Sequence, residues 1–211
     1  MKTRTKSQQE ALWHIRVVHE RMLPKYRELP EEERWQKFSH EEWRAAILLY
    51  VKTEGHYWPL LPDNYNCGRL LDVGCGSCCP AQHLRHTELW GIDPLIPFYL
   101  SAGFPMLEYG AVLLPFSAED MWMVPDNFFD TIVTQNAIDH CDDFEQVCAE
   151  IERVAKPTAT LRINVPYHEP TDTEPLQIDD ERVLGAFHDF TLTKLIQYDR
   201  PTVSEALWGT E

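Results

Sequence analysis

Two glycines and an acid, in the stretch Asp72-Val-Gly-Cys-Gly76, are the residues best suited to hold a ligand. They follow a short apolar run, Leu70 to Val73, and a helix is predicted to begin near Pro80. Glycine allows positive φ and lets a ligand come close where a Cβ would block it. The N–H groups of a helix that follows such a turn point at whatever the turn holds. The stretch therefore predicts a strand, a turn and a helix around a nucleotide-type pocket.

A second acid, Asp93, lies 19 residues after Gly74, at the end of the next apolar run, Leu89 to Ile92. A carboxylate in this place can accept hydrogen bonds from the hydroxyls of a ribose. The two features together predict an adenosine-like ligand. They do not distinguish a nicotinamide dinucleotide from S-adenosylmethionine.

Short apolar runs alternate with helical patterns from Leu70 onward, which predicts a parallel sheet with helices on both faces. Five strands are expected at residues 70–73, 89–92, 111–114, 131–134 and 160–165. Asp142 or Asp143 should cap a helix that runs to Val154, and another helix is expected at 180–187. Runs at 190–198 and 203–208, divided by Arg200-Pro201, predict a closing antiparallel hairpin.

Ligands of such sheets lie beyond the carboxyl ends of the strands. The polar and glycine-rich segments of this chain follow the predicted strands at those ends: 74–79, 93, 117–120 and 136–140. We give this coincidence more weight than any single motif.

The first 64 residues have a different character, with three predicted helices rich in aromatic residues. Capping boxes are expected at Ser7 to Glu10 and at Ser39 to Glu42, and a charged helical piece at 30–38 lies between them. These helices should cover one side of the core. An alternative is that they also form a lid over a substrate pocket.

Composition excludes several classes of protein. A chain of 211 residues with 44% hydrophobic residues can bury one good core but not two full enzyme domains. A formal charge of −15 repels phosphate backbones, which argues against a broad nucleic-acid surface. We find no apolar run of membrane-spanning length and no signal peptide, and we expect a cytoplasmic protein.

Six cysteines include the pair Cys75-x-x-Cys78. No second pair follows at the spacing of a zinc ribbon, so buried reduced thiols are the favoured interpretation and no metal site is expected. Four histidines, His14, His19, His83 and His86, are interpreted as solvated helix positions.

Four segments resemble the class I S-adenosylmethionine-dependent methyltransferases: Leu71-Asp-Val-Gly-Cys-Gly-Ser77, Gly91-Ile-Asp93, Phe129-Asp-Thr-Ile-Val-Thr134 and Glu152-Arg-Val-Ala-Lys-Pro157. A dinucleotide fold would have a third glycine at position 79, where this chain has Cys. The resemblance covers about residues 65–211 and implies a Rossmann-like, seven-stranded methyltransferase sheet with an antiparallel C-terminal hairpin. Residues 65–211 would form the S-adenosylmethionine-binding domain, and residues 1–64 an N-terminal helical cap.

The resemblance also implies a set of cofactor-binding residues. Asp72 and the backbone of Gly74, Cys75 and Gly76 would hold the amino-acid end of S-adenosylmethionine, and Asp93, followed by Pro94, would bind its ribose. The remaining members are Ser117 and Ala118 at the adenine, with Glu119 or Asp120 nearby, and Gln135 and Asn136 at the methionine moiety. Two positions depart from the family: Cys78 replaces its third glycine, and Ser117 replaces its adenine-binding acid.

Asp139 and His140 follow the fourth strand, where they would face the transferred methyl group. His140 is the better candidate for a general base, because its pKa lies near working pH. The alternative is that it only packs beside the cofactor or caps the next helix. Tyr167 and His168, in the insertion after the fifth strand, are second candidates.

These features predict methyl transfer to a small-molecule acceptor, through an oxygen, nitrogen or carbon nucleophile. A protein or RNA methyltransferase is the alternative within the enzymes. Outside the enzymes, the alternative is a non-catalytic module that binds the cofactor. The departures from the family at Cys78 and Ser117 favour this alternative.

Overall fold

A computed structural model describes residues 5–23, 39–54, 64–197 and 204–209. The predicted helix at 30–38 lies outside these residues. Within them, no helix is both long enough and apolar enough to cross a membrane.

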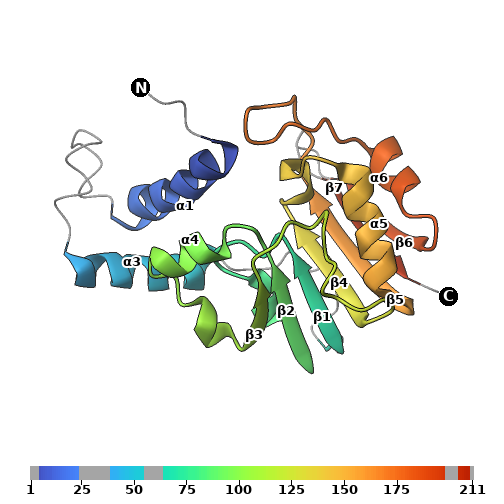
Figure 1. Ribbon diagram of the computed structural model, residues 1–211, viewed down its shortest axis with the longest axis horizontal. Coiled ribbons are helices and arrows are strands. Elements are labelled where there is room, and N and C mark those ends of the chain that lie inside the picture. Colours follow the sequence, from blue (N-terminus) through green and yellow to red (C-terminus); the bar gives the residue numbers. More distant parts are fainter. Residues whose placement is uncertain (1–4, 24–38, 55–63, 198–203, 210–211) are drawn as a thin grey trace.

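The described chain alternates strands and helices around one sheet (Figure 1). The helices are α1 (Lys6–Met22), α3 (His40–Glu54), α4 (Ile96–Ser101), α5 (Phe144–Val154) and α6 (Asp180–Ala186), with short 3₁₀ helices η2 (Pro80–His83), η3 (Met106–Tyr109) and η4 (Ile138–His140). The strands are β1 (Arg69–Val73), β2 (Glu88–Ile92), β3 (Ala111–Leu114), β4 (Phe129–Gln135), β5 (Ala155–Val165), β6 (Thr191–Gln197) and β7 (Ser204–Gly209).

The sheet has the strand order β3-β2-β1-β4-β5-β7-β6. The first five strands of this order are parallel, and β7 pairs antiparallel with both β5 and β6. The chain moves outward from β1 through β2 to β3, then returns to the other side of β1 with β4. A crevice forms at the carboxyl ends of strands where the order reverses in this way, here between β1 and β4.

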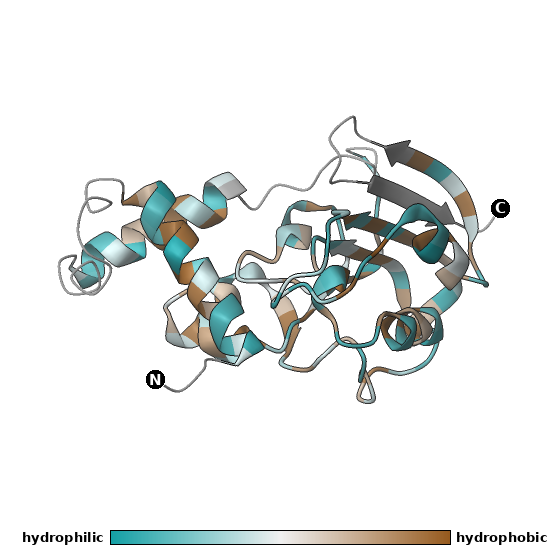
Figure 2. Cartoon of the chain, turned by 90° about the horizontal axis from the view of Figure 1, so that it is seen from above, coloured by the Kyte–Doolittle hydropathy of each residue, from teal (hydrophilic) through white to brown (hydrophobic). Residues whose placement is uncertain are grey.

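Alternating side chains divide the core into two clusters, one on each face of the sheet. Leu71 and Ile132 face the cluster that contains α5, whereas Leu70 and Val133 face the cluster that contains α1 and α3. Leu70 and Leu71 in β1, and Ile132 and Val133 in β4, are all fully buried. This is expected for strands of a parallel sheet that is covered on both faces. Seen from above, α1 and α3 lie at one end of the molecule and the hairpin at the other (Figure 2).

The N-terminal ends of the helices agree in part with the sequence. Ser39 and Glu42 form the expected capping box of α3, with reciprocal hydrogen bonds of 2.9 and 3.1 Å. Asp143 caps α5 by accepting from Gln146 N. The capping box predicted for α1 is wrong by two residues, because Thr5 rather than Ser7 is the N-cap and Gln8 closes the box.

The prediction of an α-helix that begins near Pro80 is wrong. Only the 3₁₀ helix η2, Pro80–His83, forms there. Cys79, just before it, has φ 41°, and β2 begins at Glu88, so no room remains for a longer helix. The first free N–H of this turn is used within the protein, because Ala81 N donates to Asp72 Oδ2 at 3.2 Å.

The glycine turn after β1 needs both of its glycines, for different reasons. Gly74 has φ +67°, and a Cβ at this position would lie 2.2 Å from Ala137 Cβ. Gly76 has φ +56°, but a Cβ there would meet no atom within 4 Å. Space is therefore filled at the first glycine and open at the second.

This difference predicts unequal effects of Gly74→Ala and Gly76→Ala on stability. Gly76→Ala should lower the free energy of unfolding by about 1–2 kcal/mol, the cost of a left-handed conformation for an L-residue. Gly74→Ala adds a steric clash and should lower it by about 2–5 kcal/mol. Urea denaturation followed by circular dichroism measures both, and equal losses would contradict the assigned difference in packing.

Candidate active site

A cavity of about 920 Å³ lies at the carboxyl ends of the parallel strands, beside the crossover between β1 and β4. This volume is near the upper end of the range of small-molecule pockets, about 300–1,000 Å³. All the residues predicted to bind a cofactor lie along its wall: Asp72, Gly74, Cys75, Gly76, Asp93, Pro94, Ser117, Ala118, Glu119, Gln135 and Asn136. Asp120, suggested as a substitute for the missing acid, is not among the lining residues.

Asp93 ties the glycine turn to the end of β2. Its Oδ2 accepts from Gly76 N at 2.9 Å, and its Oδ1 accepts from Leu95 N at 2.8 Å. Burial raises the pKa of this carboxyl to about 6, against the opposing effect of the two N–H donors. The carboxylate thus lies at the cavity wall with its lone pairs only partly used, and it can accept further hydrogen bonds from ligand hydroxyls.

The open space beside Gly76 indicates where a ligand can approach the backbone. Gly76 lines the cavity, and a side chain here would project into unfilled volume. Cys78, in the place of the family's third glycine, also lines the cavity but is 92% buried, so its side chain leaves the turn open. All six cysteines are free thiols, and a side-chain hydrogen bond with Cys79, together with burial, raises the pKa of Cys75.

The adenine-side residues are engaged with each other. Ser117 Oγ donates to Glu119 Oε2, and Glu119 Oε1 accepts from Asp142 N at 2.7 Å. Glu119 therefore holds the start of the segment before α5, in addition to lining the cavity. A ligand at this part of the cavity wall would contact the hydroxyl of Ser117 and the carboxylate of Glu119, whose oxygens already accept hydrogen bonds.

Helix α1 supplies part of the wall that sequence reasoning missed. Glu10, Trp13 and His14 all line the cavity. The interpretation of His14 as solvated is wrong: its ring contacts Tyr99 edge-on, with the centroids 5.0 Å apart, and burial together with His140 lowers its pKa to about 4. His19 is also buried rather than solvated. His14 lies three residues after the buried Ala11 and four before the buried Val18, so this helical spacing is the signal by which its burial could have been found.

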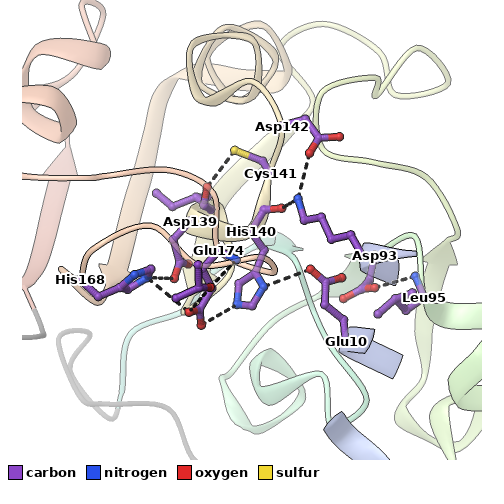
Figure 3. A network of polar contacts seen from close by, with 12 residues as sticks. Glu10, Asp93, Leu95, Asp139, His140, Cys141, Asp142, His168 and Glu174 are labelled. Carbon is purple, nitrogen blue, oxygen red and sulfur yellow. Dashed lines mark hydrogen bonds and ion pairs between the residues drawn. The ribbon is translucent and has the colours of Figure 1, made fainter. Parts of the chain in front are cut away.

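A polar network joins α1 to the strand ends (Figure 3). His140 Nδ1 lies 3.3 Å from Glu10 Oε1, and His140 Nε2 lies 3.6 Å from Glu174 Oε1. Lys6 Nζ donates to the backbone oxygen of His140 and to Asp142 Oδ1. Burial alone would lower the pKa of His140, but Glu10, Asp139 and Glu174 outweigh it and raise this pKa.

The four predicted catalytic residues are not all brought together. His140 lines the cavity, whereas Asp139, His168 and Tyr167 are not among the lining residues. Asp139 is fully buried behind His140 and lies 3.1 Å from His168 Nε2. Tyr167 donates to Asp180 Oδ1 at 2.6 Å, beside a separate small recess formed with α6. Only His140 has direct access to a ligand in the cavity.

Comparison with known proteins agrees with this geometry. Residues 71–163 match the sequence profile of a family described as a methyltransferase domain. No curated protein matches the chain. Among solved structures, the chain is similar to an S-adenosylmethionine-dependent methyltransferase from Thermotoga maritima, named as a possible histamine N-methyltransferase, at 18% identity over 94% of this chain and 100% of that one, with a TM-score of 0.56.

Two further structures show the same fold. An S-adenosylmethionine-dependent methyltransferase from Aquifex aeolicus matches at 18% identity over 88% of this chain and 96% of that one, with a TM-score of 0.53. One from Mesorhizobium loti matches at 13% identity over 71% and 94%, again with a TM-score of 0.53. At these identities the likeness shows a shared fold. Residues 71–163 thus carry a methyltransferase domain, and the solved structures that share its fold are S-adenosylmethionine-dependent methyltransferases.

Proposed function

We propose that this enzyme transfers the methyl group of S-adenosylmethionine to a small-molecule acceptor held in the cavity beneath α1. The observation that carries the proposal is the enclosure of the strand ends by α1, through Glu10, Trp13 and His14. A polymer substrate would have to displace this helix, whereas a small molecule fits inside the volume. The charge of −15 further disfavours RNA.

The proposal assigns residues 1–64 to a cap and residues 65–211 to the cofactor-binding domain. Helix α1 supports this division because its two ends make different contacts. Val17 and Val18 are buried in the core cluster beside α3, while Glu10 and His14 line the cavity. Six free thiols are typical of a reducing compartment, which supports a cytoplasmic location as part of the same proposal.

For the cofactor, we propose that Asp93 accepts the ribose hydroxyls and that the bare backbone at Gly76 lies against the amino-acid end. Asp93 fits this role because its carboxylate is fixed by two N–H donors at the cavity wall. Asp72 would act indirectly, since its Oδ2 holds Ala81 N and so shapes the turn. Gln135 and Asn136, after β4, border the same volume.

When bound, S-adenosylmethionine supplies an electrophilic methyl group on a sulfonium sulfur. The protein's main task is then to align the acceptor, and alignment of this kind supplies roughly 7–11 kcal/mol. We propose that His140 contacts the acceptor and accepts its proton, because it is the one candidate in the cavity. Glu10 lies 3.3 Å from its Nδ1, which leaves Nε2, 3.6 Å from Glu174 Oε1 and beyond hydrogen-bond distance, to accept the proton. The negative charge of Asp139 raises the pKa of His140.

The acceptor class can be tested directly. A fractionated cell extract is incubated with the enzyme and methyl-labelled S-adenosylmethionine, and the label is followed into small molecules, protein and RNA. The proposal expects the label in the small-molecule fraction. Label that precipitates with protein or RNA would overturn it, and an absence of transfer despite cofactor binding would favour a non-catalytic module.

Asp93→Asn should weaken binding of S-adenosylmethionine by about 10–100-fold at neutral pH, the cost of losing hydrogen bonds to a charged group. In the wild type, the ionised carboxylate is the form that accepts from hydroxyls. Because the pKa of Asp93 is raised to about 6, affinity should fall as the pH drops below that value, by up to about tenfold per pH unit.

Isothermal titration calorimetry between about pH 5 and pH 7 measures both effects, across the pKa window of the carboxyl. Asp120→Asn is the matched control, since Asp120 does not line the cavity. Its affinity and pH profile should equal those of the wild type. A profile of Asp93→Asn that still follows the wild type would exclude Asp93 as the source of the pH dependence.

His140→Gln should reduce kcat by about 10²–10⁴-fold if His140 accepts the proton of the acceptor. Glu10→Gln, which removes only one partner of the ring, should reduce it less. Formation of S-adenosylhomocysteine with the identified acceptor measures kcat, and cofactor affinity serves as the control for folding. A His140→Gln enzyme with unchanged kcat would leave His140 with a structural role alone.

A further inference from the structure

Three side chains with metal-ligating atoms converge behind the cavity wall: Asp139, His168 and Glu174. Each offers one ligand atom, and these atoms all lie within 4.8 Å of one another. Asp139 belongs to η4 after β4, while His168 and Glu174 belong to the segment after β5. The carboxyl ends of two neighbouring parallel strands thus bring them to one point (Figure 3).

His168 is oriented as a ligand would be. Its Nδ1 lies 2.8 Å from the backbone oxygen of Glu169, so Nδ1 carries the proton that is donated there. Its Nε2 lies 3.1 Å from Asp139 Oδ2 and 3.8 Å from Glu174 Oε2. A histidine that binds a metal through one nitrogen commonly donates from the other to a backbone carbonyl, which fixes the ring and the tautomer.

The burial of Asp139 is a second, independent indication of a bound cation. Its side chain is completely buried, and its Oδ1 has no hydrogen-bond partner among the described residues. Burying a carboxylate with an unsatisfied oxygen is costly unless a cation compensates it. His168 contacts only the other oxygen of this carboxylate. The described side chains therefore do not supply enough positive charge or enough hydrogen-bond donors to compensate the buried carboxylate of Asp139.

Glu174 is held in place by a tight loop. Thr171 N donates to Glu174 O at 2.8 Å, Glu174 N donates to Thr171 Oγ1 at 3.0 Å, and this hydroxyl lies 3.2 Å from Glu174 Oε2. The carboxylate is thereby fixed with one oxygen toward His168 and the other toward His140 Nε2. Glu174 also lines the cavity, so the cluster adjoins the proposed acceptor site.

The spacing of the ligand atoms suits a small divalent ion. Nitrogen and oxygen ligands at about 2.1 Å from a tetrahedral ion are separated by roughly 3.4 Å. The distances from His168 Nε2 to Asp139 Oδ2 and to Glu174 Oε2, 3.1 and 3.8 Å, lie on either side of this value. Small side-chain rotations would therefore place all three atoms around one ion.

We propose that Asp139, His168 and Glu174 bind a divalent transition-metal cation at the edge of the cavity. Imidazole and carboxylate together favour ions such as Mn²⁺, Fe²⁺, Co²⁺ and Zn²⁺. The nearby thiol of Cys141 is not part of the site, because burial raises its pKa to about 12 and it donates to Ile138 O. No metal site was predicted from the sequence, because the cysteines lack the spacing of a zinc ribbon, and Asp139, His168 and Glu174 meet only in the folded chain.

This site has a consequence that rests on the proposed function. Glu174 and His140 form both the edge of the cluster and part of the cavity wall. An acceptor with a hydroxyl or amine at that wall could take an open position on the ion. Metal binding itself does not depend on methyl transfer, so the two proposals can fail separately.

Binding of Mn²⁺ alone to the full, untagged and chelator-treated chain tests the site. Mn²⁺ prefers carboxylate and imidazole to thiolate, so the free cysteines compete little. Isothermal titration calorimetry should find one equivalent bound by the wild type. His168→Gln and Glu174→Gln should each weaken this binding at least about tenfold. Asp139→Asn is less informative than these variants, because a change in a fully buried carboxylate impairs folding as well as metal binding.

Two matched variants serve as controls and should bind Mn²⁺ as the wild type does. His86→Gln alters another histidine whose Nδ1 contacts a backbone oxygen, that of Leu84. Asp172→Asn alters an exposed acid in the same segment as Glu174. Thermal unfolding with and without Mn²⁺ gives a second readout, and the metal-induced shift should vanish in His168→Gln and Glu174→Gln alone.

Three results would overturn the proposal. The first is no binding by the wild type at millimolar Mn²⁺. The second is binding that His168→Gln and Glu174→Gln leave unchanged, which would indicate adsorption to the acidic surface. The third is a loss of thermal stability in His168→Gln that Mn²⁺ does not influence in any variant. It would mean that a protonated His168 simply forms ion pairs with Asp139 and Glu174.

Discussion

One carboxylate, that of Asp93, determines how the ligand-binding end of the sheet is assembled. It joins the N–H of Gly76, in the turn after β1, to the N–H of Leu95, just after β2. The turn can approach this acid only because Gly74 and Gly76 accept positive φ, and because Gly91 leaves room for the Cys75 sulfur, which a Cβ there would meet at 2.9 Å. The cavity, its open backbone and its acidic wall all follow from this constraint.

Local patterns in the sequence predicted the parallel strands and the residues at their ends. Apolar runs and the acids that follow them are properties of neighbouring residues, and the geometry of parallel strands gathers the ends without further information. The glycine turn, Asp93, Ser117 and Asn136 were found in this way. The helix after Pro80 was mispredicted because the short path from Cys79 to β2 overrides local propensity.

Contacts between distant segments could not be predicted in this way. Glu10 and His140 are 130 residues apart, and Asp139 and His168 are 29 apart. Neither pair leaves a periodic trace, since polar residues that meet across a cavity obey no helix or strand spacing. His14 was misread for a different reason: it was judged by its polar residue type, although it lies on the face of α1 that carries the buried Val18 and contacts Tyr99.

Helix α1 is attached to the rest of the molecule by two unlike kinds of interaction. Near its C-terminal end, Val17 and Val18 are buried in an apolar cluster that salt does not weaken. Near its other end, Lys6 and Glu10 hold the segment around His140 through charged and polar contacts. Ionic strength screens this second kind selectively. Salt should therefore release the N-terminal end of α1 while its C-terminal end stays packed in the core. As a result, the rate at which ligands enter and leave the cavity should rise with salt.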